Sequence, residues 1–510
     1  MEKEPGSLPD NVSHCHAIIA DLQKEVEQNK VFIRKLQHQI ESLLRHRYGQ
    51  RADRINPNQL VFEAMQELMK SGSEPEESAK EGKKTKPPKE EKKRKGHGRT
   101  RLPEHLRRER VEHEISPEEL VCKQCGREKE RFGEEVSERL EFQPASLYVI
   151  QDVRPKVACR ACESGAVTAT KPMQPIEKGL PGPGLLAHVV TSKYADHLPL
   201  HRLEGILKRQ GVDVSRKTMC DWTASCAELL NPLYDLMKEE ILQSKVIHTD
   251  DTSIPVQDPD CTRTRTGRIW VYIGSRDHPY TVYDYTPSRG GAGPAEFLKA
   301  YCGYLQADAY AGYDGIYAGG DVHEVACWAH VRRKWVDAQT TDLSRAVIAT
   351  AWIKMLYRVE EEARDLEASQ RLTLRQEKSA PLLSDFKRWL REQEKTVLPK
   401  SPIGEATNYT LNNWEALNRY LEDGDLAIDN NAAERALRGI VIGRKNWLFA
   451  GSDKGGRTAA VLFSFVMTCK NHRIDPFAYF RDVFNRISPH PVKRLSELLP
   501  DKWQEFREEN

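Results

Sequence analysis

The sequence has no long hydrophobic run. Its longest apolar stretch, from Ala459 to Met467, is interrupted by Ser464 and is less than half as long as a bilayer-spanning helix. The first residues also lack the apolar core of a secretory signal. We therefore expect a protein of the reducing cytoplasm with no membrane partner, and at 510 residues it should form about three or four folded units.

Cysteine is scarce and odd in number, with 11 residues, so a disulfide framework is not expected. Four cysteines form two close pairs, Cys122 with Cys125 and Cys159 with Cys162. Four thiolates complete the tetrahedral shell of one structural Zn²⁺ and leave no open position for catalysis. A redox pair is the alternative, but the two pairs together favour a zinc ribbon over 111–172, with strand-like residues at 147–153.

The chain has almost no net charge, with 78 Lys and Arg against 76 Asp and Glu. The balance conceals a basic segment, 80–110, which holds 14 Lys and Arg but 5 Asp and Glu. Such a segment attracts nucleic acid, and Arg99 and Arg101 are candidate DNA contacts. A solvated linker without a partner has the same composition, so both interpretations stay open.

A heptad pattern begins at Ile19. Apolar residues recur at alternating steps of three and four, with β-branched residues at one core position and Leu at the other, and this predicts a parallel two-stranded coiled coil. An amphipathic helix packed on its own domain is the alternative. The seam comprises Ile19, Leu22, Val26, Asn29, Ile33, Leu36, Ile40 and Leu43. Homodimerisation would pair Asn29 with its counterpart.

Residues 183–243 have a helical pattern with a break at 211–214, and Ser215 is a predicted N-cap. Two helices about a short turn could form a DNA-binding helix-turn-helix, in which Arg216 and Lys217 would contact DNA. A plain helical hairpin is equally compatible with the pattern.

Strand patterns then follow at 245–256, 268–274, 281–285, 304–308 and 322–327, with a helix at 294–301. This order of strands and helices is that of a ribonuclease-H-like sheet, in which the first and fourth strands are neighbours. Residues 331–425 are almost wholly helical in pattern, and another helix starts near Asp429, capped by Asp429 or Asn430. The predicted fold class is therefore multidomain α+β, with an N-terminal coiled coil, a zinc ribbon and a ribonuclease-H-like core that has an all-helical insertion.

Three acidic residues on separate predicted elements could share a metal site. Asp250 lies within the first strand, Asp308 ends the fourth, and Glu434 lies on the late helix. Neighbouring strands and a crossing helix would bring them together. Carboxylate oxygens suit Mg²⁺ or Mn²⁺, and two such ions can promote phosphoryl transfer. Taken singly, each acid could equally be an ordinary surface carboxylate.

Long motifs resemble the TnpC-type DDE transposases of insertion-sequence family sixty-six. They lie at 246–252, 305–313, 327–334, 428–438 and 443–451, and upstream at 48–51, 102–106, 182–188 and 192–200, besides the zipper and both cysteine pairs. The resemblance implies a catalytic triad of Asp250, Asp308 and Glu434 that binds two divalent ions. The family usually has Glu where this chain has Asp251, and we expect Asp251 to point to the opposite face of the strand.

The resemblance and the acids agree on an activity, namely cleavage of DNA at transposon ends and transfer of the freed 3′-OH to target DNA. A non-catalytic zinc-containing DNA-binding regulator, or a ribonuclease-H-like nuclease without strand transfer, are the alternatives. The expected partners are double-stranded DNA, a second copy of the chain and possible accessory proteins of the same element. Bound to DNA, the protein would be associated with the nucleoid.

Several residues near the triad are candidate DNA contacts. Arg435 and Arg438 share the helix of Glu434, and Arg444, Lys445 and Trp447 are expected in a glycine-bounded loop that binds the DNA end. A solvated turn with a buried Trp447 is the alternative. Cys327 and His330 have a Cys-x-x-His spacing that occurs in several DDE-type enzymes, although a core histidine at a strand-to-helix turn explains His330 better.

The predicted domain plan has eight segments. They are a coiled coil (1–48), a helix and basic linker (49–110), the zinc ribbon (111–172), a helical DNA-binding segment (173–243), the first part of the core (244–335), the helical insertion (336–425), the second part of the core with Glu434 (426–470) and a helical tail (471–510).

Overall fold

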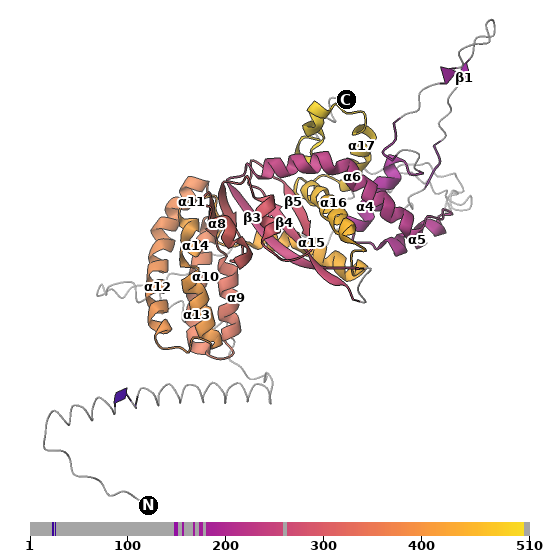
Figure 1. Ribbon diagram of the computed structural model, residues 1–510. Helices are drawn as coiled ribbons and strands as arrows, with labels where there is room; N and C mark the ends of the chain where they lie inside the picture. Colours follow the sequence, from indigo (N-terminus) through magenta and orange to yellow (C-terminus); the bar gives the residue numbers. More distant parts are fainter. Residues whose placement is uncertain are drawn as a thin grey trace, which may run out of the picture. The chain divides into compact units, whose positions relative to one another are not determined.

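The computed structural model describes residues 180–258 and 263–503, together with Gln23, Lys24, Val26 and the short stretches 147–150, 156–157, 167–168 and 173–176. The chain divides into two compact units, Met1–Glu74 with Arg154–Asn510, and Pro75–Val153. Of the second unit, only 147–150 is described. The strands and helices labelled below belong to the first unit (Figure 1).

Two short antiparallel strands, β1 (Lys156–Val157) and β2 (Val167–Thr168), flank the second cysteine pair. The predicted strand at 147–153 is wrong for residues 147–150, which have no strand structure. Two strands that pair on either side of Cys159 and Cys162 suit a ribbon around this pair, but the four cysteines themselves lie outside the described residues.

Residues 183–243 are helical with a break before Ser215, as predicted, but this part of the chain forms three helices and not two. The helices are α4 (Pro183–Tyr194), α5 (Leu200–Arg209) and α6 (Arg216–Ile241). The chain turns between α5 and α6 at Gly211, whose φ of +85° lies in the left-handed region. Ser215 is the N-cap of α6, and its side chain accepts a hydrogen bond from the Thr218 N–H at 3.1 Å. Both predictions about this break are confirmed.

The central sheet has five strands in the order β5-β4-β3-β6-β7. The first three form an antiparallel meander, and β6 and β7 run parallel to β3. The strands are β3 (Val246–Val256), β4 (Arg265–Ile273), β5 (Thr281–Thr286), β6 (Gly303–Gln306) and β7 (Val322–Val325). The prediction that the first and fourth of these strands are neighbours is confirmed.

Two predicted strand ends are wrong. β6 stops at Gln306, so Asp308 lies two residues beyond it. The ladder continues only through the Ala307 N–H, which donates to the Val325 carbonyl oxygen at 3.0 Å, before Ala309 adopts a φ of +57°. β7 stops at Val325 because Cys327 is already the N-cap of the next helix.

Three short helical elements connect β5 to β6 and β6 to β7. These are α7 (Ala292–Phe297), η1 (Ala311–Tyr313) and α8 (Asp314–Tyr317). The ring of Phe297 stacks on Tyr272 of β4 with centroids 3.7 Å apart. The hydroxyls of Tyr313 and of Thr249 on β3 form a hydrogen bond of 3.2 Å. The face of the sheet that carries Thr249 is therefore covered by α7 and η1.

The segment between β7 and the late helix is helical, as predicted. It comprises α9 (Trp328–Ala338), α10 (Leu343–Glu362), α11 (Ala368–Leu374), η2 (Arg375–Ser379), α12 (Ala380–Glu394), α13 (Pro402–Asn412), α14 (Trp414–Asn418) and η3 (Arg419–Leu421). These helices enclose their own hydrophobic core around Trp328, Trp335 and Phe386. The Ala326 N–H donates to the Ala416 carbonyl, which ties the bundle to the end of β7.

The chain ends in α15 (Asn431–Trp447), α16 (Asp453–Asn471), α17 (Pro476–Arg486) and η4 (Val492–Leu498). α15 packs against β3 and β4, and α16 lies along the edge strand β5. There, the N–H groups of Thr281 and Tyr283 donate to the hydroxyls of Thr468 and Ser464. The helix thus satisfies the backbone groups that an open sheet edge would expose.

No helix among the described residues is both long and apolar enough to cross a membrane. α16, which contains the longest apolar stretch of the sequence, is buried over most of its length in the core that it shares with the sheet. Its hydrophobicity therefore serves packing.

Candidate active site

Asp250 lies in the middle of β3, opposite Val271 of β4. Burial is the main cause that raises the pKa of its carboxyl from 3.8 to about 7, and the negative charges of Asp308, Asp251 and Glu434 add to the effect. The Asp251 N–H donates to Oδ1 of Asp250 at 2.7 Å and acts in the opposite direction. The carboxyl is therefore a poorly solvated group in a region of negative potential.

Asp308 follows β6, which pairs in parallel with β3. The pairing runs from Val246 opposite Tyr304 to His248 opposite Gln306. Asp250 and Asp308 each lie two residues beyond the last of these pairs. The loop after Asp308 is held from the helical insertion, because the Tyr409 hydroxyl of α13 donates to the Asp308 carbonyl oxygen at 3.2 Å.

Glu434 lies on the first turn of α15, and this turn is fixed by the fully buried Asn430. The Asn430 amide donates to the Thr249 carbonyl oxygen at 2.8 Å, and its Oδ1 lies 3.1 Å from Nδ1 of His248. The Asn430 N–H also donates to the Sγ of Cys327. Since His248 and Asp250 share one face of β3, these bonds set the start of α15 over the face that carries Asp250.

The predicted cap of α15 is correct in position but different in chemistry. Asn430 is the N-cap residue, but its side chain reaches the sheet and makes no capping bond. Asp429 supplies that bond instead, because its Oδ1 accepts from the Asn431 N–H at 3.1 Å. Asp429 is itself held by the Tyr357 hydroxyl at 2.9 Å.

The Glu434 carboxylate contacts two side chains of α9. Nη2 of Arg333 lies 3.1 Å from its Oε1, and Nε2 of His330 lies 3.6 Å from the same oxygen. Burial lowers the pKa of His330, with smaller contributions from neighbouring charges, so the ring is neutral near pH 7. Arg333 is therefore the cation that balances Glu434.

Among the described residues, no three His, Cys, Asp or Glu side chains stand close enough together to hold a metal ion as they are. The donor chemistry nevertheless fits a divalent cation. Asp250 senses the charges of both Asp308 and Glu434, and oxygen-only ligands are those that Mg²⁺ and Mn²⁺ prefer. The Glu434 carboxylate is paired with Arg333 in this structure, so it does not complete a set of three donors with Asp250 and Asp308.

Asp251 points to the opposite face of β3, as predicted, and is almost fully buried between two arginines. Nη1 of Arg268 lies 2.9 Å from one carboxylate oxygen, and Nε and Nη2 of Arg289 lie 3.1 and 3.0 Å from the other. Arg289 also lies over the ring of Tyr310 at 4.0 Å, and the Tyr310 hydroxyl donates to its carbonyl oxygen. This chain of contacts links the back of the Asp250 strand to the loop that follows Asp308.

Cys327 and His330 contact different partners in this structure. Burial raises the pKa of the Cys327 thiol to about 11, and its sulfur accepts the Asn430 N–H. His330 lies on the first turn of α9 beside Glu434. The histidine at a strand-to-helix turn was the favoured interpretation, and the structure adds its contact with Glu434.

The predicted end-binding loop is wrong in its structure. Arg444, Lys445 and Trp447 belong to the last turns of α15. The Arg444 guanidinium turns inward to the backbone oxygen and hydroxyl of Ser253, and Trp447 packs against the main core. Gly443 permits this packing, because a Cβ there would lie 2.7 Å from Nε1 of Trp447. Lys445 is exposed.

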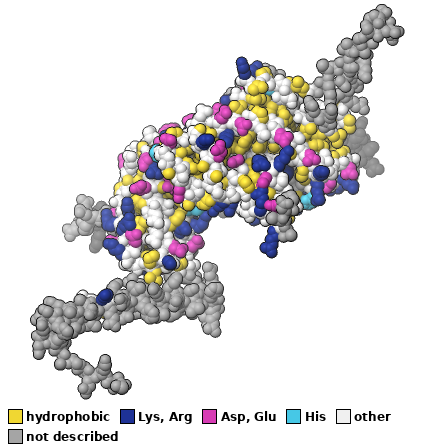
Figure 2. Space-filling model, in the orientation of Figure 1, with side chains coloured by type: hydrophobic (Ala, Val, Ile, Leu, Met, Phe, Trp, Pro, Cys, Tyr) yellow, Lys and Arg dark blue, Asp and Glu magenta, His cyan; other side chains and the backbone are white. Residues whose placement is uncertain are grey.

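The other candidate DNA contacts are exposed where the structure describes them, namely Arg216, Lys217, Arg435 and Arg438. Figure 2 shows basic and acidic side chains interspersed over the face that it draws. Arg99 and Arg101 lie outside the described residues. So does the predicted zipper seam apart from Val26, which is helical and 51% exposed.

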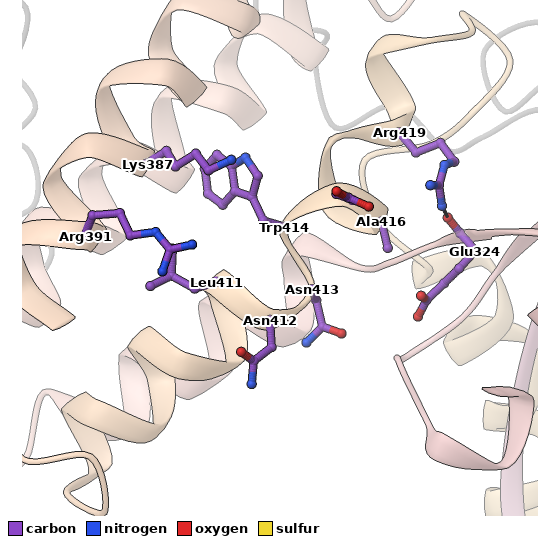
Figure 3. Close-up of a pocket in the computed structure, with 10 residues that line it drawn as sticks. Glu324, Lys387, Arg391, Leu411, Asn412, Asn413, Trp414, Ala416 and Arg419 are labelled. Carbon is purple, nitrogen blue, oxygen red and sulfur yellow. Dashed lines mark hydrogen bonds between the residues drawn. The ribbon is translucent and has the colours of Figure 1, made fainter.

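A cavity of about 290 Å³ is lined by residues of the helical insertion and by Glu324 of β7 (Figure 3). Lys387 lies 5.5 Å from the centre of the Trp414 ring at its wall, and the Arg419 guanidinium donates to the Glu324 carbonyl oxygen. None of Asp250, Asp308 and Glu434 lines it.

Comparison with known protein families decides the affiliation. The family model described as "Transposase IS66 family" matches residues 178–458, which include all three acids. The chain belongs to the IS66 transposase family. Three further models of the same family match, described as the zinc-finger binding domain of transposase IS66 (119–163), the IS66 C-terminal element (464–500) and "Transposase C of IS166 homeodomain" (35–111). The zinc-finger match spans all four paired cysteines.

Relatives of this IS66-family chain occur in Sinorhizobium fredii (strain NBRC 101917 / NGR234). The uncharacterized protein y4hP is 35% identical over 496 residues, which cover 92% of this chain and 88% of the relative. The uncharacterized protein y4qI is 34% identical over 521 residues, covering 98% and 94%. The similarity therefore extends through nearly the whole of each protein.

Sequence reasoning missed the residues that hold the acids in place. Asn430, Arg333 and the two arginines around Asp251 act across long sequence separations. The neighbouring Asn430 and Asn431 at the start of a helix carried the only local signal, and it was interpreted as a cap.

Proposed function

We propose that this IS66-family protein is a DNA transposase that cleaves phosphodiester bonds at transposon ends and joins the freed 3′-OH to target DNA. The observation that carries the proposal is the placement of three carboxylates on β3, just after β6 and on α15, where two of them influence the pKa of the third although the three do not yet stand close enough to hold an ion. The raised pKa of Asp250, to which Asp308 and Glu434 both contribute, supports it. Burying an acid among acids is costly unless a cation is to be bound.

The sheet is proposed to be a ribonuclease-H-like core. Its strand order and the parallel β3–β6 pair support this assignment. In such an arrangement the neighbouring central strands carry two of the acids and a helix packed on the same face carries the third.

Asp250, Asp308 and Glu434 would hold two divalent cations, Mg²⁺ or Mn²⁺. When bound, these ions would activate the attacking oxygen and stabilise the departing one. The protein's own cations have a separate role. Arg333 contacts Glu434 here, and it is positioned to balance phosphate charge once Glu434 is engaged elsewhere. Nearby Lys334 lies over the ring of Tyr409 and adds positive potential.

The remaining modules would bind and pair DNA. Arg216, Lys217, Arg435, Arg438 and Lys445 are exposed and would contact phosphates, as would Arg99 and Arg101. Cys122, Cys125, Cys159 and Cys162 would hold one structural Zn²⁺, as the zinc-finger match supports. The seam from Ile19 to Leu43 would form a homodimer, which suits two transposon ends.

The test is incubation of the full-length protein with labelled DNA from the ends of its element and Mg²⁺, followed by gel sizing of products. Cleaved and joined products are expected. Glu434→Gln should keep end binding and lose cleavage, whereas Glu394→Gln, which alters an exposed pair with Arg391, should behave as the wild type. Cleavage without joining would favour a nuclease, and binding without cleavage a regulator. Normal turnover by Glu434→Gln would remove Glu434 from the site.

A further inference from the structure

One continuous exposed stripe runs along α15 away from Glu434. Arg435, Arg438, Ile442 and Lys445 follow one another at steps of three or four, which places them on one side of the helix axis, and Phe449 lies two residues beyond the end of the helix. Ile442 is 43% exposed and Phe449 is 44% exposed. Ile442 lies between Arg438 and Lys445, and the adjacent exposed pair Leu448 and Phe449 follows them, so apolar and basic side chains alternate on a stripe that starts one residue after a proposed catalytic acid.

The stripe ends in a strained turn. Leu448 has a φ of +66° and a ψ of −49°, and the Phe449 N–H donates to the Trp447 carbonyl oxygen at 2.8 Å. This is a γ-turn in its rare form with positive φ, which a residue with a side chain adopts only under constraint. Leu448 is 62% exposed, so the strained residue is not held there by burial of its own side chain.

The constraint comes from both flanks of the turn. Before it, Trp447 packs into the main core. After it, the Ala450 N–H donates to the Pro255 carbonyl oxygen at 2.9 Å, and Ala450 bridges to Val256 at the end of β3. The chain must therefore turn within two residues, and it presents Leu448 and Phe449 to the outside.

We propose that Leu448 and Phe449 form a wedge that inserts against unstacked base pairs at the transposon end, while Arg438 and Lys445 bind the adjacent phosphates. This inference rests on the proposed function and names the base-contacting residues of that same site. Cations attract the DNA backbone without regard to sequence. Apolar side chains beside them stack on bases or pry them apart.

In this proposal Leu448 and Phe449, and not Trp447, are the residues that contact bases. The indole was predicted to stack on an unpaired base, but it is committed to the core. Its packing instead orients the turn that follows. Ile442 lies one helical turn before Lys445 and extends the apolar surface toward Arg438.

The test compares two probes of about 30 base pairs and identical sequence, one blunt and one with mismatched terminal pairs that are already open, each bound to full-length protein. Leu448→Gly combined with Phe449→Ala removes the wedge, and glycine keeps the positive φ of the turn. Val492→Ala, which shortens another exposed apolar side chain, is the control.

The wild type and the control should bind the open-ended probe about tenfold more tightly than the blunt one, and 2-aminopurine near the end should brighten on binding. The wedge variant should bind both probes equally. A retained tenfold preference in that variant overturns the wedge while leaving the transposase proposal intact. Failure of the wild type to bind either probe overturns both. A change in oligomeric state of the DNA-free variant would assign the turn to a protein interface instead.

Discussion

Replacing Asp250 by Asn is expected to stabilise the protein when Mg²⁺ is absent. Burial and neighbouring acids raise the pKa of Asp250 to about 7, so the ionised carboxylate is unfavourable in the folded chain above that pH. Asn has nearly the same shape without the charge, and its Oδ1 can still accept the Asp251 N–H. The variant would thus exchange activity for stability.

The magnitude follows from the gap between the ordinary pKa of 3.8 and the folded value of about 7. Below pH 3.8 the carboxyl is protonated in both states and costs nothing. As pH rises, the unfolded chain loses its proton first, so stability falls until the folded pKa is passed. The full cost above pH 7 is at most about 4 kcal/mol, and at pH 5 it is about 1.6 kcal/mol.

Urea unfolding followed by tryptophan fluorescence at pH 8 and pH 5 measures the effect, with zinc retained and Mg²⁺ omitted. Asp250→Asn should gain more stability at pH 8 than at pH 5. Asp385→Asn, which alters an exposed pair with Arg388, should change little. Added Mg²⁺ should stabilise the wild type but not the variant. A loss of stability at pH 8, or an equal gain at both pH values, would refute the reasoning.

Three further predictions concern the supports of the site. Arg289→Ala removes one of the two arginines that hold Asp251, together with the guanidinium over the Tyr310 ring, and should raise the Mg²⁺ concentration needed for half-maximal cleavage severalfold, whereas Arg388→Ala should not; an unchanged titration would count against the link. Asn430→Ala removes a buried anchor and should lower the free energy of unfolding in urea by about 2–4 kcal/mol; a loss below about 0.5 kcal/mol would contradict it. Cys159→Ser should release zinc, as elemental analysis would show, and zinc-free wild type would end that idea.

Local pattern was enough to predict the sheet. Runs of β-branched residues separated by turn residues marked each strand, and the order of strands and helices implied which of them pair. The Ser215 cap was also predictable, because capping chemistry depends on residues three positions apart. In both cases the interactions that decide the structure join residues close together in the sequence, or follow from general rules about how strands and helices connect.

The end of α15 was not predictable from local pattern. Gly443 and Gly451 suggested a loop, since glycine disfavours helices. The helix continues through Gly443 because the Trp447 ring packs against that position, where any Cβ would be too close. A glycine that breaks a helix and one that admits a neighbouring side chain are identical in sequence. Only the tertiary partner tells them apart.

The three proposed catalytic acids were predictable from the sequence, but the contacts that position them were not. Residue types and strand order were sufficient to nominate Asp250, Asp308 and Glu434, because β3 and β6 are parallel neighbours and the first two acids each lie two residues beyond their last pair. The start of the helix that carries the third is held by Asn430, whose side-chain amide bonds a strand carbonyl and a histidine, and whose backbone N–H donates to a cysteine sulfur, each more than 100 residues away. Such an anchor has no sequence period, so it becomes visible only when the sheet and the helix are seen together. In the proposed site, catalysis would depend as much on Asn430 as on the acids, because a carboxylate displaced by about 1 Å would no longer share a cation with its neighbours.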